Sequence, residues 1–495
     1  MWFLAACRHE PEPPVETDAD TDADADTDTD TDADTDLVGT TVQIRAHDPE
    51  SGALLPFDDA IDRISARGAH RYDRAGWRHD ALVRPDLTLV VNAPLVPVEG
   101  ATFGFEVPEP GVELALPWFV PGRGWELWTV APAGSVVELE LEVARGLAAR
   151  FPAAADAHPA GDGPVAQGLA AGAAASLAQA EAEPDEAARA RAAVDAVEGW
   201  SDAWEELLAG DADPTGAWWG VTLDGAGDDR HDVDASVGAL YGADGWARLV
   251  ATEHLAPEDA EPEIRRLQAQ GTRVLVQLMD SSGMAALTDA AYEARVAATV
   301  GALGDTVEAY EVGNEINGPW VPRDRDDPWA VGARVTATLD QVEQGAPGAL
   351  TVLTLFWTGG ADPAPYAMFD WVDQVLAPTD RDRIDVVALS LYVEDDPLGM
   401  PAFDRVMTEL GRRFPRAEIA LGELDYFSAD TSRVWAWGDL DDPEGAGRIR
   451  VFEAYTAASL AFGPGGGFWW YYETEAYPGW PTNPLWQVMA DAHGG

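Results

Sequence analysis

Two glutamates each follow an apolar run of the kind that forms a buried β-strand. Glu315 comes after Val307–Val312, directly behind Asn314, and Glu423 comes after Glu418–Leu421. A carboxyl group can donate a proton, accept one or attack an electrophilic carbon, depending on whether it is ionised. Two such groups facing each other across a cleft would therefore suit a reaction that needs both an acid and a nucleophile.

Hydrolysis of a glycosidic bond is a reaction with this requirement. One carboxylic acid protonates the leaving oxygen, while a second carboxylate meets the positively charged sugar carbon from the opposite face. The two groups must differ in pKa. A nearby negative charge or burial keeps the acid protonated, whereas cationic or hydrogen-bond-donating neighbours keep the nucleophile ionised.

The elements around these glutamates predict an α/β fold, a (β/α)8 TIM barrel. From about Trp218 onward strand-like runs alternate with helical stretches, and eight such units in about 280 residues fit this fold. The expected strands are 217–223, 247–252, 273–279, 307–312, 350–356, 384–391, 418–421 and 468–472, and the expected helices include 257–270, 286–303, 328–344 and 445–461. Active sites of this fold lie at the C-terminal ends of the strands. Glu315 and Glu423, which close the fourth and seventh strands, should therefore face each other across the barrel mouth.

The Asn-Glu pair after the fourth strand and the single Glu after the seventh resemble clan A glycoside hydrolases, which are retaining (β/α)8 enzymes. The resemblance covers about residues 216–495. It implies that Glu315 is the acid/base, that Asn314 bonds the sugar 2-hydroxyl and that Glu423 is the nucleophile. No metal or cofactor is implied.

Three further residues are similar to positions of this clan. Arg248 on the second strand matches the Arg that helps to keep the nucleophile ionised, and Tyr392 at the end of the sixth matches the aromatic or His position beside it. Trp469 on the eighth strand matches the Trp that floors the subsite for the reacting sugar. The sequence departs from the clan at Leu391, where His or Asn is often found. It also lacks the His-rich third-strand signature of the xylanase-type branch, and Asp280 closes that strand instead. The clan is therefore implied, but no family within it.

Each of these residues also has a structural interpretation. The Asn-Glu pair could be a surface turn, Glu423 could form a salt bridge at a strand end, and Arg248 could pair with a core acid. Tyr392 and Trp469 could simply pack, and Glu311 is expected to be paired or exposed rather than catalytic. Loop aromatics could act as sugar platforms or pack; these are Trp320, Trp357, Tyr426, Trp435, Trp437 and Trp480.

The composition excludes several kinds of partner. The formal net charge of −57 argues against nucleic acid or anionic lipid, whereas a neutral carbohydrate is not repelled. All 31 basic residues are Arg, so a Schiff-base or P-loop lysine is excluded. With one cysteine, Cys7, no intramolecular disulfide is possible.

The stretch Leu4-Ala5-Ala6-Cys7 resembles a bacterial lipobox, in which the Cys is lipidated, although only six residues precede Cys7. Residues 1–7 are accordingly interpreted as a truncated lipoprotein signal. In the acidic linker 8–36, the run Thr17–Asp36 alternates Asp with Thr or Ala and should be an extended, disordered tether. We expect an exported bacterial protein at the cell surface or outer membrane, attached to the membrane only through Cys7.

Two more regions precede the barrel. Residues 37–145 read as short strands separated by Gly and Pro, with Thr41–Arg45 and Val136–Val143 as examples, and predict a small β-sandwich-like domain. Its Trp118, Trp125 and Trp128 could pack in the core or form a sugar-stacking face. The Ala-rich residues 146–215 predict a helical connector.

The sequence therefore predicts a retaining glycoside hydrolase, with an oligo- or polysaccharide substrate and a monomeric state favoured. One alternative is a catalytically silent barrel that binds carbohydrate at the cell surface. Such a protein would keep aromatic platforms but lose the geometry of the carboxyl pair. A second alternative is a structural or adhesive surface lipoprotein without a cleft at the strand ends.

Overall fold

The computed structural model describes residues 37–66, 79–121, 123–159, 161–210, 214–224, 230–242, 245–250, 257–324, 327–358, 365–393, 396–426 and 445–494. The predicted lipidation site Cys7, the acidic run Thr17–Asp36 and the loop residues Trp435 and Trp437 lie outside these ranges. Among the described helices, none is long and apolar enough to cross a membrane.

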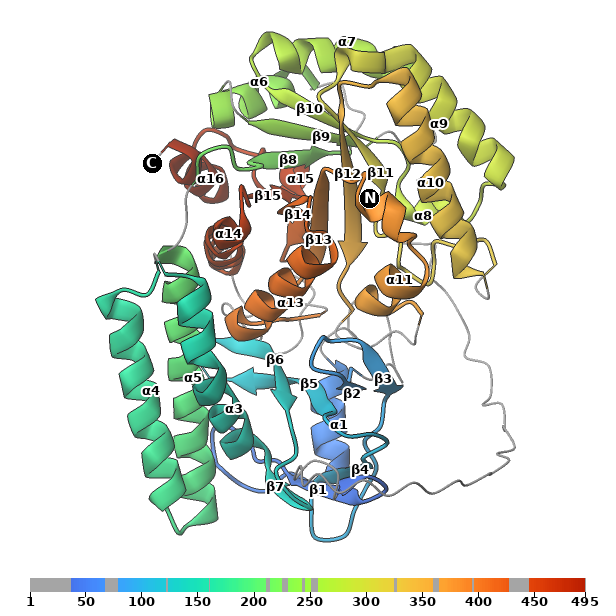
Figure 1. Cartoon of the computed structure of the whole chain (residues 1–495). Coiled ribbons are helices and arrows are strands. Elements are labelled where there is room, and N and C mark those ends of the chain that lie inside the picture. Colours follow the sequence, from blue (N-terminus) through green and yellow to red (C-terminus); the bar gives the residue numbers. More distant parts are fainter. Residues whose placement is uncertain are drawn as a thin grey trace, which may run out of the picture.

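Eight parallel strands close into a barrel, with the last strand hydrogen-bonded to the first (Figure 1). The strands are β8 (Gly220–Leu223), β9 (Trp246–Val250), β10 (Arg273–Gln277), β11 (Ala309–Gly313), β12 (Leu350–Phe356), β13 (Val386–Tyr392), β14 (Glu418–Asp425) and β15 (Gly467–Trp469). The predicted (β/α)8 barrel is confirmed, and the strand ends differ from those expected by a few residues.

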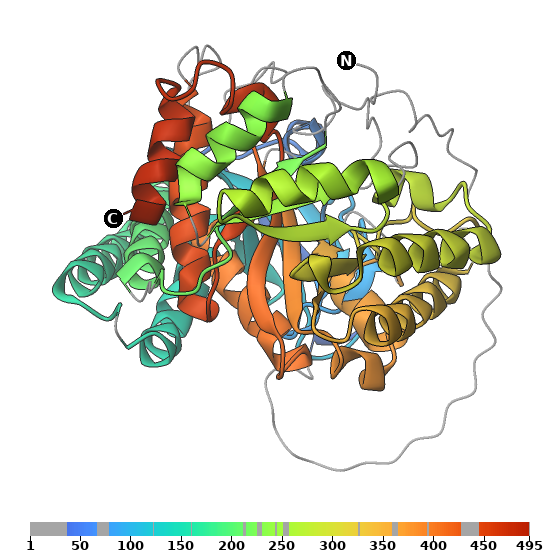
Figure 2. The same ribbon diagram turned by 90° about the horizontal axis from the view of Figure 1, so that it is seen from above.

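Helices surround this barrel (Figure 2). They are α6 (Arg230–Tyr241), α7 (Pro257–Ala269), α8 (Ser281–Met284), α9 (Asp289–Leu303), α10 (Pro328–Gly345), α11 (Met368–Gln374), α12 (Pro378–Arg381), α13 (Met400–Arg413), α14 (Ala446–Ser459), α15 (Tyr472–Glu475) and α16 (Pro484–Gly494). Local sequence sets their ends. In α10, for example, the Asp327 side chain accepts from the Ala330 amide and Pro328 takes the first helical position.

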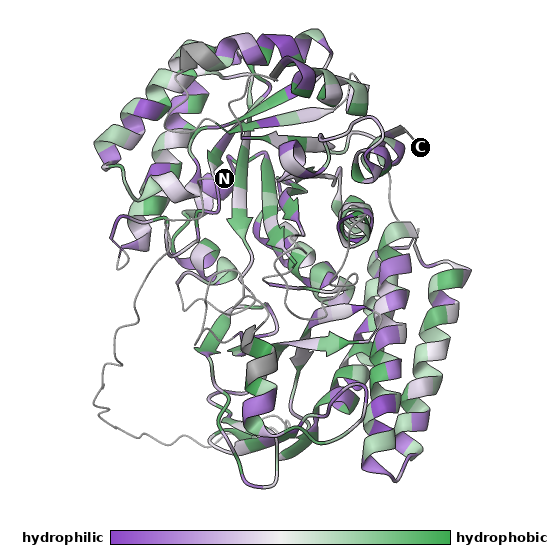
Figure 3. Ribbon diagram, turned by 180° about the vertical axis from the view of Figure 1, so that it is seen from behind, coloured by the Kyte–Doolittle hydropathy of each residue, from purple (hydrophilic) through white to green (hydrophobic). Residues whose placement is uncertain are grey.

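Apolar side chains fill the barrel interior at the starts and middles of the strands. Trp218 and Trp246 stack there at 4.1 Å between ring centroids, together with buried side chains of six further strands. In Figure 3 the barrel strands are coloured largely as hydrophobic, whereas the outer helices carry both hydrophobic and hydrophilic residues. Buried polar side chains such as Arg248, Glu311 and Thr354 follow in the middle of the strands, beyond this apolar layer.

Residues before the barrel form two small sheets with a helix, α1 (Phe57–Ala66). A three-stranded sheet has the order β4 (Phe103–Glu106), β1 (Thr41–Arg45), β7 (Val136–Glu138), and a four-stranded sheet has the order β3 (Leu89–Asn92), β2 (Ala81–Val83), β5 (Glu113–Val120), β6 (Gly124–Val130). The predicted N-terminal β-rich region is confirmed. Trp118, Trp125 and Trp128 are all buried, so they pack in the core and present no sugar-stacking face.

Three helices follow the sheets, as predicted for the Ala-rich region. They are α3 (Leu139–Ala157), α4 (Pro164–Ala182) and α5 (Glu186–Gly210). The expectation of a strand over Val136–Val143 is wrong beyond Glu138, because α3 already begins at Leu139. Leu139, Val143 and Leu147 recur every four residues and are all buried on one helix face.

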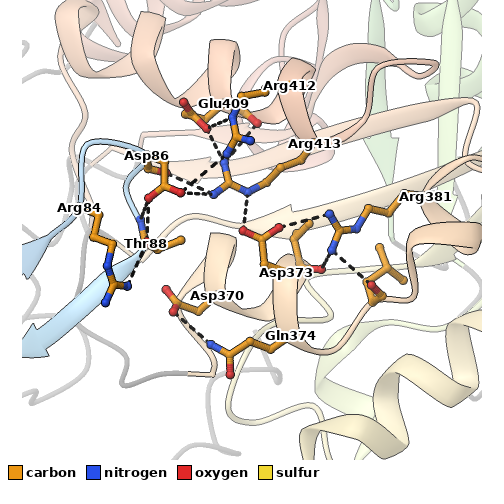
Figure 4. A network of polar contacts seen from close by, with 12 residues as sticks. Arg84, Asp86, Thr88, Asp370, Asp373, Gln374, Arg381, Glu409, Arg412 and Arg413 are labelled. Carbon is orange, nitrogen blue, oxygen red and sulfur yellow. Dashed lines mark hydrogen bonds and ion pairs between the residues drawn. The ribbon is translucent and has the colours of Figure 1, made fainter.

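The sheets and helices of residues 37–210, here called the N-terminal module, pack against the barrel (Figure 1). The Leu127 amide of β6 donates to the Leu398 carbonyl, and the Leu89 amide of β3 donates to Asp370 of α11. Figure 4 shows a network of polar contacts at this junction, in which Asp86 of the module faces Arg412 and Arg413 of α13. The module therefore lies against the barrel on the side of α11 and α13, the helices that follow β12 and β13.

Candidate active site

Glu423 enters the barrel interior because of a bulge in β14. The pairing of β13 with β14 shifts after Leu389 and Leu421, so that Gly422 is passed over and Ser390 pairs with Glu423. A Cβ at position 422 would lie 2.8 Å from the Thr354 side chain, so glycine fits this close approach. The bulge thus turns the side chain after Gly422 inward.

The Glu423 carboxylate is buried and accepts hydrogen bonds at both oxygens. Its Oε1 accepts from Arg248 Nη2 and from Asn314 Nδ2, each at 2.8 Å. Its Oε2 accepts from the Tyr392 hydroxyl at 2.5 Å, with Ser390 Oγ at 3.3 Å. Four donors from three strands, β9, β13 and the end of β11, therefore converge on one carboxylate, and these donors favour its ionised form.

Glu315 lies directly across from it and is surrounded mainly by hydroxyl groups. Its Oε1 accepts from Ser390 Oγ at 2.7 Å and its Oε2 from Ser281 Oγ at 3.0 Å. The Trp320 indole donates in turn to Ser281 Oγ at 3.2 Å. No Arg among the described residues bonds this carboxyl group, in contrast to the Arg248 contact of Glu423.

The backbone at Glu315 is in the left-handed region, with φ of +46°. A residue with a Cβ rarely adopts this conformation, which costs of order 1–3 kcal/mol. Such strain is maintained where surrounding contacts determine a side chain's position, and here it coincides with the position of Glu315 at the barrel mouth.

The surroundings separate the pKa values of the two glutamates. Burial, together with the negative charge of Glu423, raises the pKa of Glu315 well above its usual value. Burial also raises the pKa of Glu423, but the Arg248 guanidinium and the Tyr392 hydroxyl oppose the rise. Glu423 is therefore the first of the pair to ionise, and Glu315 is the one that keeps its proton.

Arg248 connects Glu423 to a second buried acid. Its guanidinium forms a two-pronged pair with Glu311, with Nε and Nη2 each 2.9 Å from a carboxylate oxygen. Thr354 also donates to Glu311. Burial alone would lower the pKa of Arg248, but the charges of Glu311 and Glu423 raise it, so the guanidinium stays charged. The expectation that Glu311 is a paired acid rather than a catalytic one fits these contacts.

The structure brings together five of the six predicted site residues: Arg248, Asn314, Glu315, Tyr392 and Glu423. It does not bring Trp469 to them. Trp469 is only 1% exposed, packs against Phe452 of α14 and donates to Glu475.

The pleat of the eighth strand explains this difference. Phe468 faces the barrel interior, so Trp469 points outward and Trp470 points back in. The Arg248 guanidinium lies over the Trp470 ring, 5.2 Å from its centroid. Trp470, which is partly exposed, is therefore the tryptophan of this strand end that lies beside the site residues.

Two serines of the site were not predicted. Ser390 lies two residues before Tyr392 and therefore shares its face of β13, whereas Leu391, at which a departure from the clan was noted, points into the surrounding core. Ser281 follows Asp280, whose side chain caps α8 by accepting from the Ser282 amide. Strand alternation could have identified Ser390, but a serine alone carries little signal of chemistry.

Two of the four predicted loop aromatics within the described residues are buried and two are partly exposed. Trp357 and Tyr426 are buried, Trp320 is partly buried and bonds Ser281, and Trp480 is partly exposed and lies against Trp486. Within the described residues, no group of three or more His, Cys, Asp or Glu side chains is arranged to hold a metal ion.

The sequence matches no protein-family model and no curated protein. Among solved structures, this chain is similar to native xylanase 10B from Thermotoga maritima, with 9% identity over 57% of this chain and 96% of that chain and a TM-score of 0.40. It is similar to the GH53 catalytic domain of Ignisphaera aggregans, with 17% identity, coverage of 55% and 90%, and a TM-score of 0.36. A GH10 endoxylanase from a sugarcane soil metagenome gives 10% identity, coverage of 56% and 98%, and a TM-score of 0.39. Likenesses this weak carry no argument about activity, which rests on the site itself.

Proposed function

We propose that this protein is a retaining glycoside hydrolase that cleaves O-glycosidic bonds of an oligo- or polysaccharide by double displacement. The observation that carries the proposal is the pair of glutamates at the barrel mouth. Glu423 has a guanidinium and an amide among its donors, whereas the donors to Glu315 among the described residues are hydroxyls, and their pKa values are separated accordingly. One carboxylate and one carboxylic acid side by side are the two groups that this chemistry needs.

The spacing of the pair supports retention of stereochemistry. Ser390 Oγ lies 2.7 Å from a Glu315 carboxyl oxygen and 3.3 Å from a Glu423 carboxyl oxygen. The distance between these two carboxyl oxygens therefore cannot exceed the sum of the two hydrogen-bond distances. Retaining enzymes hold their carboxyl groups about 5–5.5 Å apart, and inverting enzymes about 6.5–9.5 Å, which leaves room for a water. A pair bridged by one hydroxyl fits the shorter spacing.

In the first proposed step, Glu423 attacks the anomeric carbon while the bond from that carbon to the leaving oxygen breaks. Glu315 gives its proton to the leaving oxygen, which departs as an alcohol, and a glycosyl ester of Glu423 remains. In the second step, water attacks the same carbon, Glu315 takes a proton from it and the ester bond breaks. The free sugar is released, and both glutamates return to their initial states.

The proposal is tested with Glu315→Ala and Glu423→Ala on a panel of aryl glycosides and neutral glycans. Loss of the nucleophile should abolish turnover of every substrate. Loss of the acid should slow glycan cleavage by about 10²–10⁴-fold, but spare formation of the glycosyl ester from aryl glycosides with good leaving groups. The ester should then accumulate and appear by mass spectrometry as one added sugar.

A wild-type protein that binds glycans but releases no product would instead identify a catalytically silent carbohydrate-binding barrel. Unchanged turnover in Glu423→Ala would exclude the double displacement outright. Thermal unfolding of both variants serves as the control for folding.

A further inference from the structure

The turn after β13 joins the N-terminal module to the candidate site. β13 ends at Tyr392, whose hydroxyl donates to Glu423 at 2.5 Å. The amide of Asp396 then bonds back to the carbonyl of Tyr392 at 2.9 Å. The position of Asp396 therefore bears directly on the residue that holds the Glu423 carboxylate.

The side chain of Asp396 faces the module. His79 Nδ1 lies 3.0 Å from Asp396 Oδ1, and both side chains are almost fully buried. Two further contacts hold the same turn: the Leu127 amide donates to the Leu398 carbonyl at 2.9 Å, and Gly399 lies so close to Glu126 that a Cβ there would meet it at 2.7 Å. A segment of the barrel that borders the site is thus packed against β6 and the chain before β2.

We propose that His79 of the N-terminal module is a positioning residue of the site, which acts through Asp396 on Tyr392. The contacts run without a break from His79 to Asp396, to the Tyr392 backbone and from the Tyr392 hydroxyl to Glu423. The N-terminal module is accordingly part of the catalytic unit rather than a separate binding domain. The effect on turnover rests on the proposed function, but the effect on the turn does not.

The charge balance around Glu423 explains why this position matters. Burial and the negative charges of Glu311 and Asp280 favour the neutral form of Glu423, and Glu315 lies beside it. Among the described residues, Arg248 and the neutral donors oppose them, and Tyr392 gives the shortest of these hydrogen bonds. A small displacement of its hydroxyl should therefore raise the pKa of Glu423 and shift the acid side of the pH profile upward.

The chain offers a matched control for this contact. His158, also in the module and also buried, places Nε2 3.0 Å from Asp404 of α13, away from the turn. His79→Ala and His158→Ala thus remove equivalent contacts between the module and the barrel. His79→Asn serves as the conservative variant, because an amide nitrogen can replace Nδ1 opposite Asp396.

The three variants of the full-length protein are compared in two measurements. The first is hydrogen–deuterium exchange of peptides that cover residues 386–399. The second is the pH dependence of kcat/KM on the substrate that the wild type hydrolyses best, with Tyr392→Phe as reference.

We expect faster exchange in His79→Ala but not in His158→Ala. In His79→Ala, the acid limb of the pH profile should also shift by about half a pH unit, in the same direction as in Tyr392→Phe, and kcat/KM should fall about tenfold. His79→Asn should recover most of the wild-type exchange rate and most of the wild-type pH dependence of kcat/KM. Exchange and pH profiles that are the same in His79→Ala and His158→Ala would overturn the inference, even if the glutamate variants confirm the proposed function. If no glycoside is hydrolysed, the proposed function fails and the exchange measurement alone decides the inference.

Discussion

A single hydroxyl group stands between the two glutamates. Ser390 has one proton to donate, yet both Glu315 and Glu423 lie within reach of its oxygen. When Glu315 is protonated, its own O–H can bond Ser390 Oγ, which leaves the serine proton free for Glu423. The two carboxyl groups therefore titrate as a linked pair, with Ser390 as the link.

Ser390→Ala should shift the pH optimum of glycoside hydrolysis upward by about half to one unit. The substitution removes a donor from the ionised forms of both Glu315 and Glu423, so the pKa of each should rise and both limbs of the bell should move together. Fitting kcat/KM against pH for wild type and variant measures the shift.

Ser390→Thr retains a hydroxyl group at the same position and should keep the wild-type profile, which makes it the control. A profile of Ser390→Ala that is unchanged, or that moves toward lower pH, would contradict the assigned coupling.

The sequence was sufficient to predict five of the residues that meet at the site, because strand-end position in a barrel determines which side chains converge. It was not sufficient for Trp470 or Ser390. Trp469, which was predicted, and Trp470, which lies beside Arg248, differ by one position, and in a strand one position reverses the face. The short eighth strand, with Gly467 at its start, has too little alternation to fix that register from sequence.

At the scale of elements, a buried histidine joins β1 to two helices of the module. His47 follows β1 and is 1% exposed, with Nδ1 2.8 Å from Glu140 of α3 and Nε2 2.9 Å from Glu186 of α5. Burial lowers the pKa of His47, but the hydrogen bonds and charges of the two glutamates outweigh it and raise the pKa above its ordinary value. The protonated form thus holds the sheet and the helices together.

His47→Asn should destabilise the protein at about pH 6 by about 1–3 kcal/mol, and by less at about pH 9. The folded pKa lies above the unfolded one, so the stabilisation is fully present below pH 6.5 and is lost as pH rises through the folded pKa. Asn keeps a donor toward Glu140 but cannot take up the proton. Urea unfolding at the two pH values measures the difference, and an equal or larger loss at high pH would contradict a charged His47.

Glu140 also shows why the first residues of α3 were predicted as a strand. Alternating Leu and Glu over residues 136–143 is typical of a half-exposed strand, yet Glu140 is buried against His47, far away in sequence. Once a glutamate can be an interior residue, the pattern also fits a helix with period 3.6. That partner cannot be read from a local window. The uncharged run 350–356, which combines Leu and Phe with the β-branched Thr351, Val352 and Thr354, carries no such ambiguity, and there the predicted strand agrees with β12 at both ends.

At the scale of the whole molecule, ion pairs bind the module and the barrel into one unit. In Figure 4, Arg413 of α13 contacts Asp373, Glu409 and Asp86, the last of which belongs to the module. A second network links Arg123 of the module to Glu205, which also bonds Arg450 of α14. Arg413–Glu409, four residues apart on one helix, is the pairing among these that spacing could predict. The others join segments that are far apart in sequence and that only the finished fold brings together.

Arg413→Ala should lower the free energy of unfolding by about 2–3 kcal/mol while leaving one cooperative transition. The guanidinium is buried and also lies 4.2 Å from the Phe369 ring centroid, so its loss removes packing as well as charge. Calorimetry measures both the free energy of unfolding and the number of transitions. Arg416→Ala is the control, since Arg416 makes only an exposed pair with Asp382. Two separate transitions in the wild type would show that module and barrel unfold independently.

The contact between the module and the barrel also bears on the order in which the chain is made. The module ends with α5 at Gly210, and of the barrel helices that it touches, α13 ends at Arg413 and α14 follows later still. Roughly 200 residues separate these points, which at typical rates of synthesis corresponds to about 10–40 s. The sheets and helices of the module therefore have time to fold before β12, β13 and their helices leave the ribosome. For this half of the barrel, folding then becomes assembly onto a surface that is already in place.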